Sequence, residues 1–312
     1  MAKPSFDHPV LEPLRLRFET PAMKQLSEEL HRWLWTGATG GLIYGTSRVG
    51  KSIAVQMLAT QLYTRGKVKI PVYYFSLHGR DQRTITSVFR NLCYDANLRV
   101  TNRDPADHLS DRFVHYIADK AVEANCRNAI LIVDEMQRLR LNQFDPFAEL
   151  YDKLLLLDIS LTVIFVGNDP ECWTLVEQIE NPKYAHIRGR FFTQGIQFLG
   201  LTSEKQVKSC LSKYDKLRYP ENGPTYVEYF LPEATRKGWC LASLSGEFWR
   251  VFREYQRNYH IESWGMKFFT SATNTLLSDY LVRYGIDNFD DDIMHECIRI
   301  SGLIPNLVKP AK

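Results

Sequence analysis

The chain has 312 residues, of which 45% are hydrophobic, and a formal net charge of +3. This length suits one large or two ordinary domains with buried cores, and so small a charge neither establishes nor excludes a nucleic-acid partner. The sequence contains no apolar run of about 18 residues and no signal-peptide pattern, so we expect a cytoplasmic protein without a membrane span. Its six cysteines are scattered without a Cys-x-x-Cys pair, which argues against a metal or redox site.

The first part of the chain alternates predicted helices with predicted strands. Residues 1–20 mix prolines with basic and apolar residues and predict an extended arm. Thr20 and Pro21 have the form of a helix N-cap followed by proline at the first helical position, which predicts a helix ending near Trp35. Further elements are predicted as strands at 41–44 and 70–76 and as helices at 53–59, 84–97 and 109–125. Pro71 restricts the second strand to a sheet edge or to its own start.

Continuous apolar runs at 129–133 and 161–166 are typical of central parallel strands that are covered on both faces. A last strand is predicted at 195–199, and helices are predicted at 147–157 and 171–180. Strands that alternate with helices in this way predict an α/β fold with a doubly wound parallel sheet of about five strands. The aromatic run at 73–75 is expected to lie in the sheet core rather than to stack on nucleic-acid bases.

From residue 202 on, the β pattern ends and helical periodicity takes over. The helical segments are expected at 202–218, 224–236, 244–258, 262–284 and 287–301. We therefore expect three parts, an N-terminal arm at 1–20, an α/β domain at 21–201, and a helical domain with a C-terminal segment at 202–312.

Residues 45–52 fit the phosphate-loop pattern of glycine, four residues, then Gly-Lys-Ser. Gly45 and Gly50 let the backbone turn and bring N–H groups onto phosphate oxygens. Lys51 places its charge on the β- and γ-phosphates, and the Ser52 hydroxyl binds Mg²⁺. A chance match in a glycine-rich turn is the alternative, but the pattern lies between a predicted strand and a predicted helix. The residues expected to hold a nucleoside triphosphate are Gly45, Thr46, Ser47, Arg48, Val49, Gly50, Lys51 and Ser52.

Polar residues follow the two central strands. Asp134 and Glu135 end the first run, as in a Walker B site, where Asp134 holds Mg²⁺ directly or through water and Glu135 orients and deprotonates the attacking water. Asn168 stands just beyond the second run, at the edge where open α/β sheets bind ligands, and can position that water. The alternatives are two solvated acids at a strand end and an ordinary Asn-Asp-Pro turn.

Arg188 and Arg190 lie between a short predicted helix and the last strand. An arginine at this place can reach the γ-phosphate held by a neighbouring subunit and act as an arginine finger. The sequence does not separate this role from that of two surface arginines.

These motifs, in this order, resemble the AAA+ ATPases over residues 20–285. The resemblance implies ATP and Mg²⁺ as cofactors, ATP hydrolysis as the activity, and a lid that supplies a further arginine to the nucleotide. The segment 244–250 resembles that motif, with Arg250 as the candidate and Arg253 as the second choice. It departs from the small-residue Gly-Asn-x-Arg form that is usual there.

The arm before Thr20, the loop at 45–52 and the run Asp134-Glu135-Met136-Gln137 look like those of the TnsC and TniB transposition regulators, most of all TnsC of CRISPR-associated transposons. The resemblance implies a homo-oligomeric ring or filament on double-stranded DNA that links a TniQ-containing target-selection complex to the transposase subunits. Contacts to DNA would then go mainly to phosphates. The candidates are Arg80 and Arg83 after the second strand, then Arg138 and Arg140 after Asp134-Glu135, with solvated basic loops as the alternative.

Two other functions remain open at this point. One is a small-molecule P-loop kinase or other NTPase, which the lack of an obvious acceptor site in the second half disfavours. The other is a nucleotide-binding scaffold with little turnover, which the presence of Glu135 disfavours.

Overall fold

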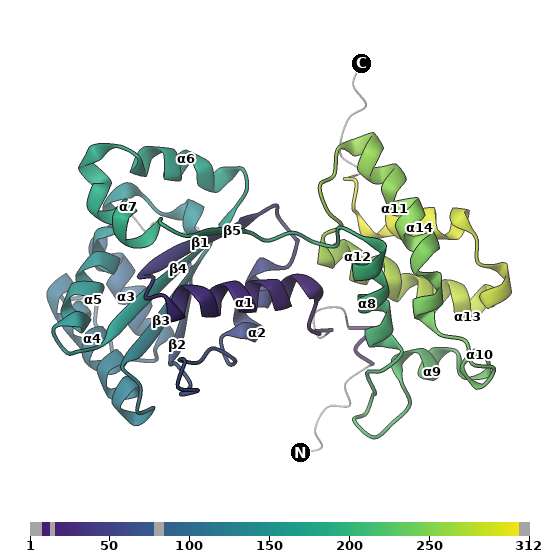
Figure 1. Ribbon diagram of the computed structural model, residues 1–312, viewed down its shortest axis with the longest axis horizontal. Helices are drawn as coiled ribbons and strands as arrows, with labels where there is room; N and C mark the ends of the chain where they lie inside the picture. The colour runs from purple at the N-terminus through teal and green to yellow at the C-terminus, as the bar shows by residue number, and fades with distance from the viewer. Residues whose placement is uncertain (1–7, 13–15, 78–83, 306–312) are drawn as a thin grey trace. The chain divides into compact units, whose positions relative to one another are not determined.

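The computed structural model describes residues 8–12, 16–77 and 84–305 (Figure 1). The chain divides into two compact units. The α/β unit comprises Gln25–Ser47 and Lys51–Phe198, and the helical unit comprises Met1–Lys24, Arg48–Gly50 and Leu199–Lys312. The division thus falls within three residues of the boundary expected near residue 201, and it groups the N-terminal segment with the helical unit.

Within the described residues, five parallel strands form one sheet in the order β2-β3-β4-β1-β5. The strands are β1 (Gly40–Gly45), β2 (Val72–Ser76), β3 (Asn128–Asp134), β4 (Ser160–Asn168) and β5 (Gly195–Gln197). This confirms the predicted doubly wound sheet and places β2 at an edge, one of the two positions that Pro71 allows. Because all strands are parallel, their carboxyl ends meet at one edge, where Gly45 pairs with Asn168 and Asp134 pairs with Ser76.

Alternate residues of the buried strands face opposite sides of the sheet, and each side has its own helices. The first side carries α3, α4 and α5, which pack on β-strand residues such as Phe75, Leu131 and Phe165. Figure 1 shows α1 and α2 on the other side. The helices of this unit are α1 (Pro21–Trp35), α2 (Lys51–Leu58), α3 (Ile85–Asp95), α4 (Ala106–Glu123), α5 (Asp145–Leu155), α6 (Glu171–Ile179) and α7 (Ala185–Phe191), with 3₁₀ turns η1 (Met136–Arg138), η2 (Leu141–Gln143) and η3 (Pro182–Tyr184).

Proline accounts for two differences from the predicted helix boundaries. Helix α4 begins at Ala106, directly after Pro105, and α5 begins at Asp145 with Pro146 in its first turn. The predicted boundaries take both prolines as breaks and therefore start each helix too late. The first turn of a helix needs no N–H from proline, so a proline there starts a helix instead of interrupting it.

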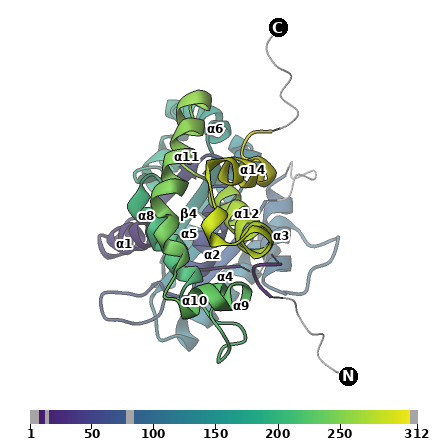
Figure 2. The same ribbon diagram turned by 90° about the vertical axis from the view of Figure 1, so that its right-hand side faces the viewer.

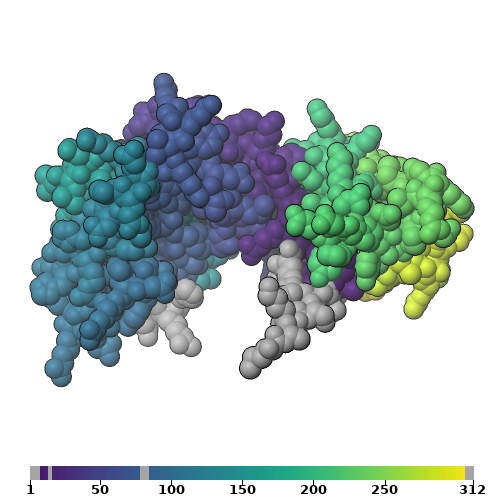
Figure 3. Space-filling view, turned by 90° about the horizontal axis from the view of Figure 1, so that it is seen from below, coloured from purple at the N-terminus to yellow at the C-terminus, as the bar shows by residue number. Residues whose placement is uncertain are grey.

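The helical unit contains no strand among its described residues, as the sequence predicts (Figure 2). Its helices are α8 (Glu204–Tyr214), α9 (Tyr226–Phe230), α10 (Pro232–Arg236), α11 (Ser245–Tyr259), α12 (Met266–Thr275), α13 (Leu281–Tyr284) and α14 (Asp291–Ser301), with 3₁₀ turns at Leu241–Leu244 and Ile286–Asn288 and a π-helical turn at Leu276–Tyr280. Phe252 stacks on Trp264 at 4.6 Å between ring centroids at the centre of its core. Figure 3 shows the part of this unit that follows residue 198 in green to yellow. Among the described residues, no helix is both long and apolar enough to cross a membrane.

The described part of the N-terminal segment packs into the helical unit instead of extending freely. Val10, Leu16 and Phe18 are buried in its core, and the Asn274 side-chain amide donates a 2.9 Å hydrogen bond to the Val10 carbonyl. Burying these three apolar side chains stabilises the docked segment by several kcal/mol, at about 25 cal/mol per Å².

Candidate nucleotide-binding site

The phosphate loop leaves β1 at Gly45 and enters α2 at Lys51. A Cβ atom at Gly45 would collide with the backbone oxygen of Phe198, so glycine is required there. Arg48 and Gly50 have φ values of 67° and 108°, in the left-handed region that turns successive N–H groups toward one side. The loop therefore presents backbone donors next to the N-terminus of a helix, which is the geometry that binds phosphate.

Lys51 is 6% exposed and is held at the start of α2. Its ammonium donates to the Gly45 oxygen at 2.7 Å, the Thr46 oxygen at 2.9 Å and Asn168 Oδ1 at 3.0 Å. Burial lowers the pKa of Lys51, and the nearby Asp134 carboxylate opposes that shift. All three hydrogen-bond acceptors are neutral, so an anionic phosphate would compensate the buried charge far better than they do.

Asn168 ends β4 beside Gly45, as its position after an apolar run predicts. Besides accepting from Lys51, it donates its backbone N–H to Gln137 Oε1 at 3.2 Å. The Gln137 amide also donates to Glu135 Oε2 at 2.8 Å. Gln137 therefore joins the end of β4 to the acidic pair that follows β3, a bridge that the sequence did not predict.

Asp134 is 4% exposed, and both of its oxygens accept hydrogen bonds. Oδ1 accepts from the Glu135 backbone N–H at 2.9 Å, and Oδ2 accepts from the Tyr74 hydroxyl at 2.5 Å. The sequence predicts Tyr74 in the sheet core together with its neighbours. Phe75 is indeed buried there, but Tyr74 lies on the opposite face and reaches the site.

Glu135 has a left-handed backbone with φ 61°, which is rare for a residue with a side chain and often marks a functional position. The 3₁₀ turn η1 that follows brings two donors back to its carboxylate. They are Gln137, at 2.8 Å, and Arg138, which forms an ion pair with Glu135 at 3.3 Å. Arg138 also donates to the Leu77 backbone oxygen at 2.6 Å.

The two candidate finger residues lie on α7 in different environments. Arg190 forms a 3.0 Å ion pair with Asp152 and lies over the Tyr151 ring at 5.3 Å. Arg188 is exposed and donates to the Glu180 backbone oxygen at 3.2 Å, and no carboxylate within the described residues pairs with it. Arg190 is thus held by side chains of α5, whereas the Arg188 guanidinium remains accessible.

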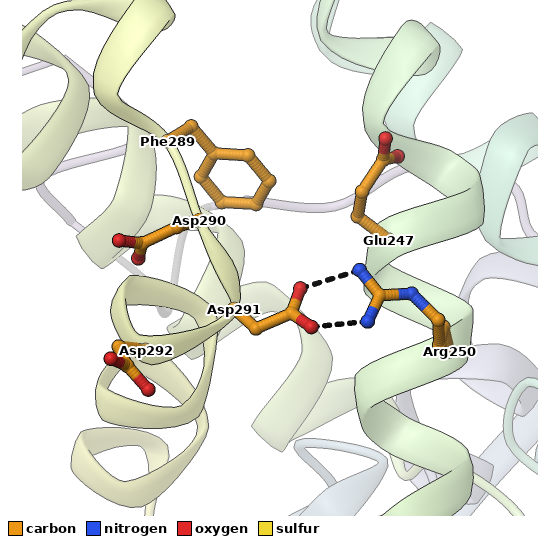
Figure 4. Close-up of a pocket in the computed structure, with 6 residues that line it drawn as sticks. All are labelled: Glu247, Arg250, Phe289, Asp290, Asp291 and Asp292. Atoms are coloured by element: carbon orange, nitrogen blue, oxygen red, sulfur yellow. Dashed lines mark hydrogen bonds and ion pairs between the residues drawn. The ribbon is translucent and has the colours of Figure 1, made fainter.

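The lid candidate Arg250 lies on α11 in the helical unit. Figure 4 shows Asp291 of α14 pointing at its guanidinium, with a hydrogen bond of 2.6 Å from one of the two terminal nitrogens. Their pocket has a volume of about 460 Å³ and is lined by Glu247, Arg250, Phe289, Asp290, Asp291 and Asp292. This acidic lining is unsuited to phosphate, so Arg250 would have to leave Asp291 in order to contact a nucleotide.

Of the four predicted DNA contacts, Arg80 and Arg83 lie outside the described residues. Arg140 is exposed and precedes η2, where its backbone N–H donates to Gln143 at 2.9 Å. Arg138 is committed to Glu135 and Leu77 as described above. The described cysteines carry no disulfide, and burial raises the pKa of Cys172, on α6, to about 11, so this thiol stays protonated.

Residues 35–176 match the family described as AAA domain. The match covers the loop at 45–52, Asp134, Glu135 and Asn168. The α/β unit has the fold of an AAA+ P-loop ATPase.

The chain is similar to several solved structures. Drosophila ORC bound to DNA is 17% identical with a TM-score of 0.51, over 93% of this chain and 68% of that chain. Cdc6p from Pyrobaculum aerophilum is 19% identical with a TM-score of 0.46, over 90% of this chain and 72% of that one. The Aeropyrum pernix ORC2 protein in its ADP form is 13% identical with a TM-score of 0.48, over 91% and 69%. Such identities concern the fold alone. No curated protein sequence matches the chain.

Two site residues, Tyr74 and Gln137, were not assigned from the sequence. Gln137 is only two residues after Glu135, so a turn can bring its side chain onto the Glu135 carboxylate. That short spacing is the feature of the sequence that could have indicated the contact. Tyr74 offers a weaker signal, since only the register of β2 on β3 places it beside the site.

Proposed function

We propose that the protein is a Mg²⁺-dependent ATPase. The observation that carries the proposal is the convergence of Lys51, Asp134, Glu135 and Asn168 at one edge of the sheet, beside the phosphate loop. Three strands that are far apart in sequence deliver these groups to one place, which neither a chance glycine-rich turn nor two unrelated solvated acids would do. The match of residues 35–176 to the AAA domain family supports nucleotide binding at this loop.

The residues present fit a magnesium ion. Mg²⁺ prefers hard oxygen ligands, and Ser52 and Asp134 supply a hydroxyl and a carboxylate. Asp134 accepts a hydrogen bond from the Tyr74 hydroxyl, and Ser52 lies close enough to that hydroxyl to influence its pKa, so both residues lie near the same phenol. When bound, the ion neutralises charge on the β- and γ-phosphates.

The remaining steps belong to the chain's own groups. Lys51 exchanges its neutral acceptors for phosphate oxygens, and the loop N–H groups bind the rest of the phosphate chain. Glu135 accepts a proton from the attacking water, and the Asn168 amide orients that water. For this step the Glu135 carboxylate must turn from Gln137 and Arg138 toward the nucleotide.

We further propose that ATP joins subunits of a homo-oligomer. Arg188, the more accessible arginine on α7, would contact the γ-phosphate held by the neighbouring subunit as an arginine finger, whereas Arg190 would support α7 through Asp152. An arginine supplied in trans stabilises the charge of the transition state and makes hydrolysis depend on assembly.

The resemblance of the phosphate loop and of the Asp134–Gln137 run to TnsC and TniB supports a finer proposal. The protein would assemble on double-stranded DNA with ATP and connect a TniQ-containing target-selection complex to the transposase subunits, and hydrolysis would weaken the assembly. The similar Drosophila ORC structure is bound to DNA, which supports the DNA-binding part.

The test images the purified protein by negative-stain microscopy with double-stranded DNA, with and without a slowly hydrolysed ATP analogue. Rings or filaments that need both DNA and nucleotide are expected. Glu135→Gln should keep ATP binding and remain assembled in the presence of ATP. Its rate of phosphate release should fall at least about a hundredfold. A monomer that turns over ATP without DNA would refute the assembly proposal and favour a small-molecule P-loop enzyme. ATP binding with no loss on Glu135→Gln would favour a scaffold.

A further inference from the structure

The Tyr74 hydroxyl lies between the two proposed magnesium ligands. It donates to Asp134 Oδ2 at 2.5 Å and interacts with the side chains of Ser52 and Gln56. Ser52 and Gln56 are four residues apart on α2 and therefore share one helix face. The phenol oxygen is thus bounded by α2 on one side and by the end of β3 on the other.

The pleat of β2 explains why this tyrosine reaches the site. Tyr73 and Phe75 face the side of the sheet covered by α4, where Tyr73 packs edge-on against aromatic rings. Tyr74 faces the opposite side, toward α2. Tyr74 pairs with Ile132 in the parallel register, so Asp134 lies two residues further along on the same face. A side chain as long as tyrosine, leaning along the strand, covers that interval.

The phenol takes up coordination capacity that a cation needs. One Asp134 oxygen already accepts the Glu135 N–H, and Tyr74 occupies the other. A neutral O–H donor aimed at the carboxylate mimics a metal-bound water in position but contributes no positive charge.

We propose that Tyr74 competes with Mg²⁺ for Asp134 and Ser52, so that metal binding requires the phenol to turn away. This inference rests on the proposed Mg²⁺-nucleotide site. It assigns Tyr74 a regulatory role: the phenol lowers the affinity of the site for Mg²⁺-nucleotide without changing its affinity for nucleotide alone.

Tyr74→Phe removes one oxygen atom and keeps the ring. The affinity of the full-length protein for fluorescently labelled ADP is measured in excess Mg²⁺ and in EDTA, and the ratio of the two affinities is compared between variants. The free energy of a hydrogen bond to a charged acceptor is large enough to change an equilibrium about tenfold or more. We therefore expect Tyr74→Phe to raise the ratio of the affinity in Mg²⁺ to the affinity in EDTA about tenfold. The EDTA affinity should stay within about twofold of wild type, because the phenol touches none of the loop N–H groups.

Tyr73→Phe is the matched control. It removes a hydroxyl from the adjacent residue on the other face of the same strand, where that hydroxyl is buried and has no hydrogen-bond partner among the described residues. Its affinity ratio should equal that of wild type. If Tyr74→Phe does not fold, Gln56→Leu provides the same test, because losing the amide loosens the phenol and should also raise the ratio.

A ratio that stays at the wild-type value, or falls, in Tyr74→Phe would overturn the proposal, and a fall would show that the phenol helps to hold the metal ligands. A rise of the same size in Tyr73→Phe would also overturn it, since the effect would then belong to the strand as a whole. If wild-type protein binds labelled ADP but Tyr74→Phe leaves the affinity ratio unchanged, only this inference is refuted. Wild-type protein that binds no labelled ADP would refute the nucleotide site and this inference together.

Discussion

Gly167 lies at the point where β4, η1 and α6 meet, directly before Asn168. A Cβ atom there would lie 2.7 Å from Cys172 Cβ, 3.2 Å from Cys172 Sγ and 3.0 Å from Met136 Cγ. Met136 in turn directly follows Glu135. The added methyl group of Gly167→Ala would therefore clash with Met136 in the turn η1, next to Glu135, and with Cys172 in α6.

The expected cost follows from which neighbours can move. The Met136 side chain is flexible and can give way by a few tenths of an ångström. Cys172 Cβ is attached to the α6 backbone, so relieving a 2.7 Å contact requires α6 or β4 to shift. Overpacking of this kind costs about 1–3 kcal/mol. Because the shift falls between Asn168 and Glu135, we also expect loss of ATP hydrolysis beyond what the stability change explains.

Gly189→Ala is the control. Gly189 lies inside the short helix α7, and, apart from its chain neighbours and the backbone of its own helix, no atom lies within 4 Å of the point that an added Cβ would occupy. Alanine there should therefore stabilise the protein by about 0.5–1 kcal/mol. Urea unfolding followed by far-UV circular dichroism measures both variants, and phosphate release measures hydrolysis. The reasoning is refuted if Gly167→Ala unfolds at the wild-type urea concentration and hydrolyses ATP at the wild-type rate.

Three further predictions concern other parts of the chain. Arg190→Ala should lower stability by about 0.2–1 kcal/mol through loss of its partly exposed ion pair. Arg188→Ala should leave the unfolding midpoint unchanged and abolish DNA-stimulated phosphate release. If instead Arg190→Ala abolishes the stimulated release and Arg188→Ala lowers stability, their roles are exchanged. Tyr73→Phe should raise stability by about 1 kcal/mol in urea unfolding, because it removes a buried hydroxyl that lacks a partner among the described residues; a lower midpoint would contradict this. Burial lowers the pKa of His8, so docking of the N-terminal segment should be fully stable above pH 6.5 and should weaken as the pH falls toward the lower pKa of the docked state. Proteolysis of that segment should therefore be faster at about pH 5 than at about pH 7, and His8→Phe should remove this difference.

The His8 prediction follows from its contacts in the helical unit. Its ring stacks on Tyr229 at 4.5 Å and meets Tyr219, Tyr226 and Phe230 edge-on. Nδ1 accepts the Val10 N–H at 3.2 Å, whereas Nε2 is buried without a hydrogen-bond partner among the described residues. Protonating Nδ1 would remove the acceptor of Val10 and place a charge in an aromatic, buried environment, so the neutral form is favoured.

The phosphate loop and the acidic strand end could be predicted because each is a local pattern. Eight consecutive residues define the loop, and one apolar strand followed by Asp134 and Glu135 defines the second motif. Parallel pairing then predicts that Asn168 lies at the same carboxyl edge of the sheet as Gly45, and the structure adds that β4 and β1 are neighbours. The docking of Val10, Leu16 and Phe18 could not be predicted, because a short irregular segment has no periodicity and its partners lie far along the chain, as Asn274 does from Val10.

The hydrogen-bond partners of Glu135 could not be predicted from the sequence. The sequence identifies a carboxylate of the right kind after β3, but its partners depend on backbone conformation. A left-handed φ of 61° at Glu135 and the 3₁₀ turn behind it bring Gln137 and Arg138, two and three residues later, back onto its carboxylate. An extended backbone at the same residues would carry those donors away. Because Gln137 also accepts the Asn168 N–H, the partners of Glu135 are linked to the end of β4, where Asn168 in turn accepts from Lys51.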